Sequence, residues 1–218
     1  MVDLFEDNDR PPLILTVPGL GNSGPSHWQS IWEREHEHVA RVELGGWDRP
    51  HRNLWVNKLN FAIREAGRPV VLAAHSLGCL AVAWWAAMER PAYGDPVIGA
   101  LLVAPPEVDV APVDARLEAF GPAPKGTLPF PSILVASHDD PYIQFHRARR
   151  LAQFWGSRFA DAGAVGHINA DSGLGAWHFG QFLLRKVTQI GARQRDSEAH
   201  EARVPLGSPL TSRYDLGV

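Results

Sequence analysis

The sequence predicts a doubly wound α/β domain, in which a mostly parallel sheet is covered by helices on both faces. Short apolar runs rich in Val, Ile, Leu and Ala alternate with amphipathic stretches along most of the chain. Such alternation is typical of βαβ units, whose parallel strands are buried on both faces and are therefore apolar throughout. With 218 residues, 45% of them hydrophobic and 21% charged, the chain has the size and composition of one globular domain.

The first elements follow from the residues at the start of this alternation. Residues 13–17 read LILTV, the short, β-branched, apolar run that a buried parallel strand requires. Pro18 ends this strand, and a glycine-rich loop follows it. Ser26 and Gln29 have the spacing of a capping box with Ser26 as the N-cap, which predicts a helix over about residues 26–37.

The later elements rest on two signals, uninterrupted apolar runs for strands and helical spacing of apolar residues for helices. Residues 70–74 and 97–103 are runs of this kind, which we expect to be core strands. Arg90 and Pro91 end the helix that follows the first of these strands. In chain order, the elements predicted after the first helix are a strand at 39–43, a helix at 53–65, a strand at 70–74, a helix at 76–89, strands at 97–103 and 132–136, a helix at 144–155, a short strand near 157–160 and a helix at 176–190.

We interpret the chain as one folded domain, residues 13–190, between two flexible segments. Residues 1–12 are acidic and polar, and residues 191–218 are charged and weakly patterned. The acidic N-terminal residues lack the pattern of a signal peptide, and no apolar run approaches the roughly 20 residues that span a bilayer. The single cysteine, Cys79, excludes an internal disulfide and fits a reducing compartment, so we expect a cytoplasmic protein.

Charge and histidine spacing limit the partners and cofactors that we expect. The formal net charge of -3 favours neither nucleic acid nor an anionic membrane as a partner, and the sequence carries no signal for an oligomeric state. His36 and His38 flank Glu37, but side chains two positions apart on a helix point in different directions. We therefore expect a solvated helix end there, and we expect neither a metal site nor a cofactor.

One segment carries the strongest signal for chemistry. Residues 70–80 read VVLAAHSLGCL, which places Ser76 where a buried strand turns directly into a helix. This nucleophile elbow exposes the serine hydroxyl above the sheet and needs small residues two positions on either side. Those are Ala74 and Gly78, so the usual G-x-S-x-G motif is changed only by one methyl group. The N–H of Leu77 would be one oxyanion-hole donor; the alternative interpretation is that Ser76 is only a helix N-cap.

A general base and an acid follow in the order that this geometry requires, which is serine, acid, histidine. Asp139 and Asp140 come just after the predicted strand at 132–136, and we favour Asp140 because of the Pro-Tyr-Ile sequence behind it. His167 lies in a glycine-flanked loop between the last predicted strand and the last helix. Histidine removes the serine proton and the aspartate fixes its tautomer. Three such residues, each near a strand end, indicate the α/β-hydrolase fold.

The remaining site residues are assigned from the glycine-rich loop after the first strand. The N–H of Leu20 in this loop is the candidate for the second oxyanion donor. Asn22, His27 and Trp28 are candidate substrate-binding residues because they lie in or just after the loop. For Trp28, core packing is the simpler alternative.

These segments resemble the retinoblastoma-binding protein 9-like serine hydrolases over about residues 12–188. The likeness rests on the motifs VPGLGNSG followed by SHW, AHSLGC, DDPY and GHINADSGLGAW. The resemblance implies a compact α/β-hydrolase with an esterase-like activity and a triad that falls on Ser76, Asp140 and His167. The Leu-x-Cys-x-Glu motif of pocket-protein ligands does not occur, so that partner is not expected. Ala74 replaces a glycine often seen at the elbow.

We therefore expect a serine hydrolase that cleaves small carboxylic esters through an acyl-enzyme intermediate. The proline-rich segment 105–131 is too short for a large lid domain, so an open cleft and short acyl substrates are predicted. Two alternatives stay open: an amidase or peptidase that uses the same triad, and a non-catalytic binding protein that retains the fold.

Overall fold

Six parallel strands form a single sheet in the computed structural model, which describes residues 11–203 of the chain, with the side chains of 198–203 excepted. The strand order is β2-β1-β3-β4-β5-β6, and every neighbouring pair is parallel. The strands are β1 (Leu13–Val17), β2 (Val39–Arg41), β3 (Val70–His75), β4 (Val97–Val103), β5 (Ser132–Ala136) and β6 (Arg158–Asp161). The helices are α1 (Trp28–Glu35), α2 (Arg52–Glu65), α3 (Leu77–Glu89), α4 (Phe145–Trp155) and α5 (His178–Arg203), with short 3-10 helices at Ala115–Phe120 and Ala170–Ser172. The predicted α/β fold class is confirmed.

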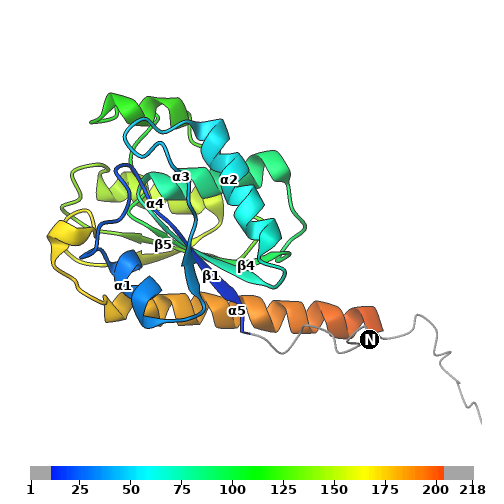
Figure 1. Ribbon diagram of the computed structural model, residues 1–218. Helices are drawn as coiled ribbons and strands as arrows, with labels where there is room; N and C mark the ends of the chain where they lie inside the picture. The colour runs from blue at the N-terminus through cyan, green and yellow to red at the C-terminus, as the bar shows by residue number, and fades with distance from the viewer. Residues whose placement is uncertain (1–10, 204–218) are drawn as a thin grey trace, which may run out of the picture.

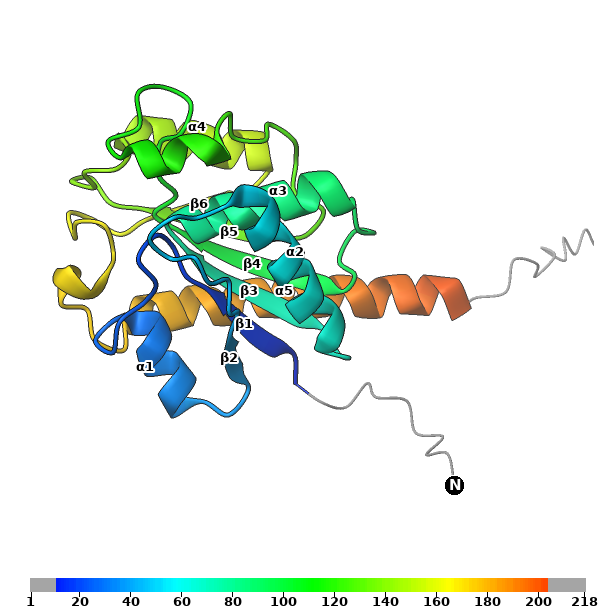
Figure 2. The same ribbon diagram turned by 45° about the horizontal axis from the view of Figure 1, so that its top comes forward.

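The helices cover the sheet in two layers. Helices α2, α3 and α4 lie on one face, and α1 and α5 lie on the other (Figures 1 and 2). Successive strand residues point to opposite faces, so Leu72 and Ala74 join the core under α2–α4 whereas Val71 and Ala73 join the core over α1 and α5. Two separate hydrophobic cores therefore hold the sheet between them.

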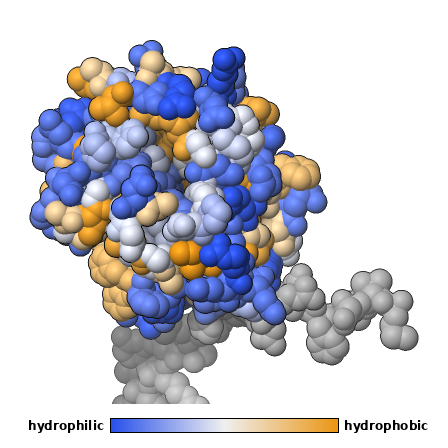
Figure 3. Space-filling model, turned by 60° about the vertical axis from the view of Figure 1, so that its left-hand side comes forward, coloured by the Kyte–Doolittle hydropathy of each residue, from blue (hydrophilic) through white to orange (hydrophobic). Residues whose placement is uncertain are grey.

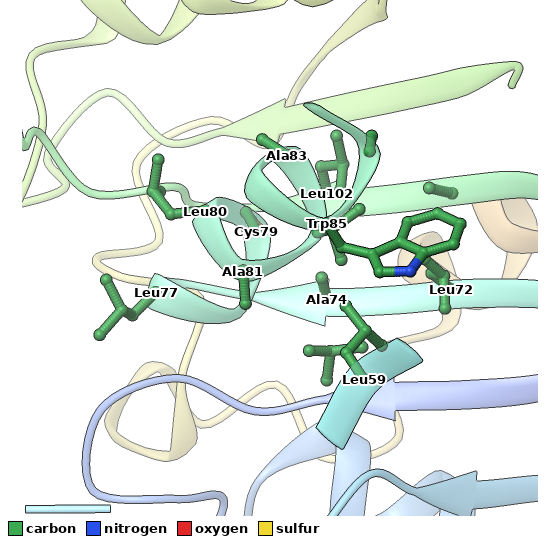
Figure 4. Packing of buried hydrophobic residues seen from close by; sticks show 14 of the residues in the cluster. Leu59, Leu72, Ala74, Leu77, Cys79, Leu80, Ala81, Ala83, Trp85 and Leu102 are labelled. Atoms are coloured by element: carbon green, nitrogen blue, oxygen red, sulfur yellow. The ribbon is translucent and has the colours of Figure 1, made fainter. Parts of the chain in front are cut away.

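The packing of α3 against the sheet sets the position of the elbow. Figure 4 shows the short side chains of this helix, Cys79, Ala81 and Ala83, in the same cluster as Ala74 of β3. Small side chains let the helix axis approach the strands closely. At Gly78 the approach is closest, because a Cβ there would lie 2.2 Å from the carbonyl oxygen of Val17.

The start of α1 and the end of α5 differ from the predicted boundaries because of contacts made elsewhere in the chain. Helix α1 begins at Trp28 with His27 as its N-cap, so the assignment of Ser26 as N-cap is wrong. The Nδ1 of His27 accepts the N–H of Gln29 at 3.2 Å. The capping box fails because the Gln29 side chain is engaged elsewhere, with Ser23 and the backbone of Ala73.

Helix α5 continues to Arg203 instead of ending near residue 190. Gly191, the first residue after the predicted end of the domain, lies inside this helix, where a Cβ would be 1.8 Å from the carbonyl oxygen of Ile98. The glycine therefore serves a close helix–strand contact rather than a helix stop. The predicted flexible tail is helical over 191–203, while 204–218 and most of the predicted flexible segment 1–12 lie outside the described residues. Within the described range, no helix combines the length and the apolar character needed to cross a membrane.

Candidate active site

Ser76 sits in a strained turn between β3 and α3. Its φ and ψ are 53° and −126°, and such a backbone costs a non-glycine residue about 1–3 kcal/mol. The surrounding backbone holds the turn: the Ser76 N–H donates to the Val103 carbonyl at 2.8 Å, and a Cβ on Gly19 would lie 2.7 Å from the Ser76 Cβ. The Ser76 side chain makes no capping bond to α3, so its hydroxyl is turned to another partner.

That partner is His167, which in turn contacts Asp140. The Nε2 of His167 lies 2.8 Å from the Ser76 Oγ, and its Nδ1 lies 2.9 and 3.0 Å from the two carboxylate oxygens of Asp140. All three residues are buried, at 8–9% exposure. A carboxylate only accepts hydrogen bonds, so Nδ1 of the neutral ring carries the proton and Nε2 is left to accept from the serine hydroxyl.

Asp139 has a different role from its neighbour. It is exposed and accepts hydrogen bonds from the Ser137 hydroxyl at 2.7 Å and from the N–H of Gly166 at 2.8 Å. These bonds, first that from Ser137, lower the pKa of Asp139 below its usual value. Asp139 therefore secures the loop that carries His167, while Asp140 contacts the imidazole.

The loop of His167 is held from several sides. The Nε2–H of His75 donates to the His167 backbone carbonyl at 2.9 Å, and the Trp28 indole N–H donates to the Ile168 carbonyl at 2.9 Å. The Tyr142 ring lies against the His167 ring, with 4.3 Å between centroids. Burial, chiefly, lowers the pKa of His75 well below its ordinary value, so this imidazole is neutral and keeps its donor proton.

The glycine-rich loop after β1 lies directly against the elbow. A Cβ on Gly19 would be 3.1 Å from the N of Leu77, which places the loop backbone beside the first turn of α3. A tight turn follows, with Gly21 and Asn22 at φ values of 76° and 65°. Among the hydrogen bonds of the described residues, none uses the N–H of Leu20 or of Leu77. Both predicted oxyanion donors are therefore unengaged beside the serine.

A buried polar network fixes this loop to the rest of the domain. Gln29 accepts from the Ser23 hydroxyl at 2.6 Å and donates to the Ala73 carbonyl at 2.8 Å, so it ties the loop to β3. Arg41 donates to the Asn22 side-chain oxygen at 3.2 Å and pairs with Glu33 at 2.7 Å. The loop therefore has fixed partners behind it, which is what a preorganised oxyanion site requires.

These groups line a cleft of about 260 Å³ at the end of the sheet where the strands finish. The face that carries the carboxyl ends of the strands is seen in Figure 3, where hydrophilic and hydrophobic side chains surround a hollow. The residues that line the cleft are Leu20, Gly21, Asn22, Gly24, His27, His75, Ser76, Arg116, Leu117, Tyr142, His167, Asn169 and Ala170.

Of the predicted substrate-binding residues, Asn22 and His27 line this cleft, but Trp28 does not. Trp28 is only 1% exposed and packs in the core over α1 and α5, so its assignment as a substrate contact is wrong. Its indole faces Trp32 and Trp177 and is held by the bond to Ile168, which leaves it no open face. The core-packing alternative applies.

Sequence reasoning missed several residues of the cleft. Arg116 and Leu117 come from the 3-10 helix at Ala115–Phe120, inside the proline-rich segment for which no element was predicted. Asn169 follows the histidine and caps the next 3-10 helix. The sequence predicted Tyr142 only as part of the turn after Asp140, not as a residue of the cleft. No periodic signal marks these positions, because they reach the cleft from loops and from a short 3-10 helix.

A larger cleft, of about 340 Å³, lies away from the triad residues, between residues 106–110 and α4. Four of its five charged side chains are paired with one another, Arg147 with Glu107 and Lys125 with Asp109 at 3.6 Å, and the fifth, Arg150, lies over the Phe154 ring. Since no titratable group in it is placed as the triad residues are, the smaller cleft is the candidate active site.

A parallel sheet with a strained serine at a strand–helix turn, and with histidine and aspartate reaching it from later strand ends, defines the α/β-hydrolase class. The chain belongs to the serine hydrolase family, whose profile matches residues 14–186. A search of curated protein sequences found no match.

Solved structures agree with this family. A protein described as a YdeN-like hydrolase from Pectobacterium atrosepticum is 32% identical, with a TM-score of 0.72 over 84% of this chain and 91% of that one. The ydeN gene product of B. subtilis is 19% identical, with a TM-score of 0.67 over 82% and 99% of the two chains. Est1E from Butyrivibrio proteoclasticus, solved with ferulic acid bound, is 13% identical, with a TM-score of 0.61 over 87% and 92%. The last two support the fold alone.

Proposed function

We propose that this serine hydrolase cleaves small carboxylic esters through Ser76, His167 and Asp140. The observation that supports the proposal is the continuous chain of contacts from the Ser76 Oγ to His167 at 2.8 Å and on to Asp140 at 2.9 Å. No rearrangement of side chains is needed to transfer the serine proton. The alternative in which Ser76 is only an N-cap lacks support, since its hydroxyl makes no capping bond.

The chemistry follows from these contacts. The Nε2 of His167 accepts the Ser76 proton while Oγ attacks the ester carbonyl carbon, and the charge collects on the carbonyl oxygen. His167 then donates that proton to the departing alcohol oxygen, which leaves an acyl-serine. Water attacks the acyl-serine with His167 again as base, and the acid is released. Asp140 stabilises the imidazolium that forms in each half-reaction.

The oxyanion is held by backbone N–H groups. We assign these to Leu77, at the first turn of α3, and to Leu20 in the loop that Gln29 secures. The start of a helix adds a favourable dipole at the same place. Removal of one such donor typically costs about 100- to 1,000-fold in kcat.

The cleft bears on the substrate class. Its volume of about 260 Å³ is below the usual range for drug-sized ligands, roughly 300–1,000 Å³, and favours short acyl groups.

The proposal also includes membership of the retinoblastoma-binding protein 9-like group and a cytoplasmic location. The single buried cysteine favours that location.

Labelling with a fluorophosphonate probe tests the proposal. Native protein is expected to label, and the Ser76→Ala and His167→Ala variants are expected not to label. Native protein that has not been exposed to the probe is then compared on matched ester and amide substrates, with faster turnover of the ester expected. Folded native protein that does not label would refute the proposed function, and faster amide turnover would replace the esterase by an amidase.

A further inference from the structure

Arg116 is the charged side chain of the candidate active-site cleft. Among the described residues that line this cleft, it is the only one with a permanent charge, and none is an aspartate or a glutamate. The cleft residues His27 and His75 are neutral at physiological pH, because burial lowers the pKa of each ring. The carboxylate of Asp140 contacts the far nitrogen of His167 and does not belong to the lining. The cleft therefore offers a substrate one permanent positive charge and no negative charge.

Asp114 holds Arg116 by one edge of its guanidinium group. The Nε–H donates to Oδ1 of Asp114 at 3.0 Å, and an Nη2–H donates to Oδ2 at 2.5 Å. Asp114 is itself fixed, because Oδ1 also accepts the backbone N–H of Arg116 at 2.9 Å as the N-cap of the 3-10 helix. No hydrogen bond of the described residues uses Nη1 of Arg116. The second edge of the guanidinium, formed by Nη1 and Nη2, is therefore free.

That free edge has the geometry of a carboxylate receptor. A guanidinium presents five N–H donors in a rigid plane, and two parallel N–H groups match the two oxygens of a carboxylate. The Arg116 side chain is 48% exposed, so a substrate can approach this edge from solvent. An ion pair as exposed as that with Asp114 is weak, and it leaves the guanidinium able to bind a second anion.

The position of Arg116 links it to the catalytic groups. Its hydrogen bond to Asp114, and to a smaller extent the charges of Asp48 and Tyr142, raise the pKa of Arg116 above its ordinary value. Tyr142 packs on the His167 ring, with 4.3 Å between centroids, and lines the same cleft. Since this cleft measures only about 260 Å³, one short substrate can contact both the base and Arg116.

We propose that Arg116 binds a carboxylate of the substrate, so that esters with a free carboxylate group are hydrolysed in preference to neutral esters of the same shape. This inference rests on the proposed esterase function and adds a substrate class to it. Either half of the ester can carry the carboxylate. Cationic esters are disfavoured, because they would place a second positive charge beside Arg116 in a lining that has no acid to pair with it.

Matched esters that differ in charge test the inference. With the carboxylate on the acid half, p-nitrophenyl hemiadipate is compared with the p-nitrophenyl ester of adipamic acid. With the carboxylate on the alcohol half, 4-acetoxybenzoate is compared with 4-acetoxybenzamide. The preference is the kcat/KM of the carboxylate divided by that of the carboxamide. Division of the native preference by that of Arg116→Gln removes the intrinsic reactivity of the esters, and this quotient is expected to be about 3- to 10-fold in at least one pair.

Two further variants separate binding from a general effect of charge. Arg150→Gln removes the same charge from an exposed arginine that lines the larger cleft, away from the triad, so it is expected to keep the native preference. Asp114→Asn keeps an N-cap acceptor for the 3-10 helix but removes the competing charge, so it is expected to raise the preference. A purely structural Arg116 would lower both kcat/KM values of a pair equally and leave the preference unchanged.

The outcomes are distinct from those of the proposed function. Failure of native protein to label with the fluorophosphonate removes the function and this inference together. Where native protein labels, a quotient below about threefold in both pairs overturns the inference alone. A preference that appears only in Asp114→Asn, or one that Arg150→Gln loses equally, also overturns it.

Should Arg116→Gln fail to fold, the salt dependence of the native preference decides. The preference is expected to fall between about 10 mM and 1 M salt, because salt screens the pair of Arg116 with the carboxylate. The net charge of -3 alone would have the opposite effect, since its repulsion of an anionic ester is also screened. A preference that does not fall with salt would then overturn the inference.

Discussion

The closest backbone contact of the site predicts the effect of a single methyl group. In Gly78→Ala the new Cβ would lie 2.2 Å from the Val17 carbonyl oxygen and 2.7 Å from that of Pro18. Ordinary contact at this point needs at least 3.4 Å, so helix α3 and the β1 end have to separate by roughly an ångström. Neither obstacle is a side chain that can turn away.

The cost can be bounded in both stability and activity. Overpacking of this kind costs about 1–3 kcal/mol, and for a chain of this size each kcal/mol lowers Tm by about 2–4 °C. A fall in Tm of about 2–12 °C is therefore expected. The same separation moves Ser76 relative to the oxyanion loop, and a 1 Å misplacement costs about 100-fold in rate.

Differential scanning fluorimetry and the rate of fluorophosphonate labelling measure the two effects. Gly126→Ala is the matched control, because a Cβ there meets nothing within 4 Å and its φ is not in the left-handed region. The control is expected to match the native protein in both assays. A Gly78→Ala protein with native Tm and native labelling rate would refute the reasoning, since the helix would then have room for the methyl group.

Three further predictions address the acid, the loop and pH. Asp140→Asn is expected to lower kcat by about 10⁴-fold because the amide cannot fix the imidazole tautomer. Asp139→Asn keeps an oxygen that accepts hydrogen bonds, so its kcat is expected to stay within about tenfold of the native value. Equal losses of kcat in steady-state assays would contradict the different roles given to the two aspartates, and a larger loss in Asp139→Asn would reverse them. Gln29→Leu leaves the Ser23 hydroxyl and the Ala73 carbonyl without their partner, at a cost of about 1–3 kcal/mol each. Both Tm and kcat are therefore expected to fall. A lower Tm with native kcat would show that the position of the oxyanion loop does not depend on this bridge. Because the pKa of His27 is about 4 in the folded state and ordinary in the unfolded chain, the unfolded chain binds the extra proton as pH falls from about 6.5 to 4, and stability is lost over that range. His27→Asn is expected to flatten the Tm profile there, with the remaining slope due in part to His75, and an unchanged profile would contradict the pKa.

The parts of the fold that sequence predicted well are those governed by local composition. Strands β1, β4 and β5 have the predicted bounds because a parallel strand buried on both faces is apolar from end to end, and Pro18 stops the first of them. The contact of Ser76 with His167, and of His167 with Asp140, was also predictable. Parallel strands finish at one edge of the sheet, and each of these residues follows a strand end. Their catalytic role stays a proposal.

The errors arose where a distant contact overrides a local signal. Gln29 reads as a capping-box residue, but its amide reaches Ala73, 44 positions away. The last helix was predicted to end near residue 190, but Gly191 allows α5 to continue past that point in close contact with the backbone of Ile98. Trp28 reads as a pocket residue because it follows a glycine-rich loop, but its indole bonds to Ile168, 140 positions away. Such partners are invisible in a single sequence.

The same contacts show how one short segment organises the site. Three consecutive residues at the start of α1 face three directions: His27 into the cleft, Trp28 to the loop that carries the histidine base, and Gln29 to the oxyanion loop. Residues one position apart on a helix do not share a face, so a single turn can reach all three places. Base and oxyanion loops therefore have a common anchor. A shift of the first turn of α1 should therefore alter proton transfer and oxyanion binding together. The losses of kcat from Trp28→Phe and Gln29→Leu should then be non-additive in a double-mutant cycle.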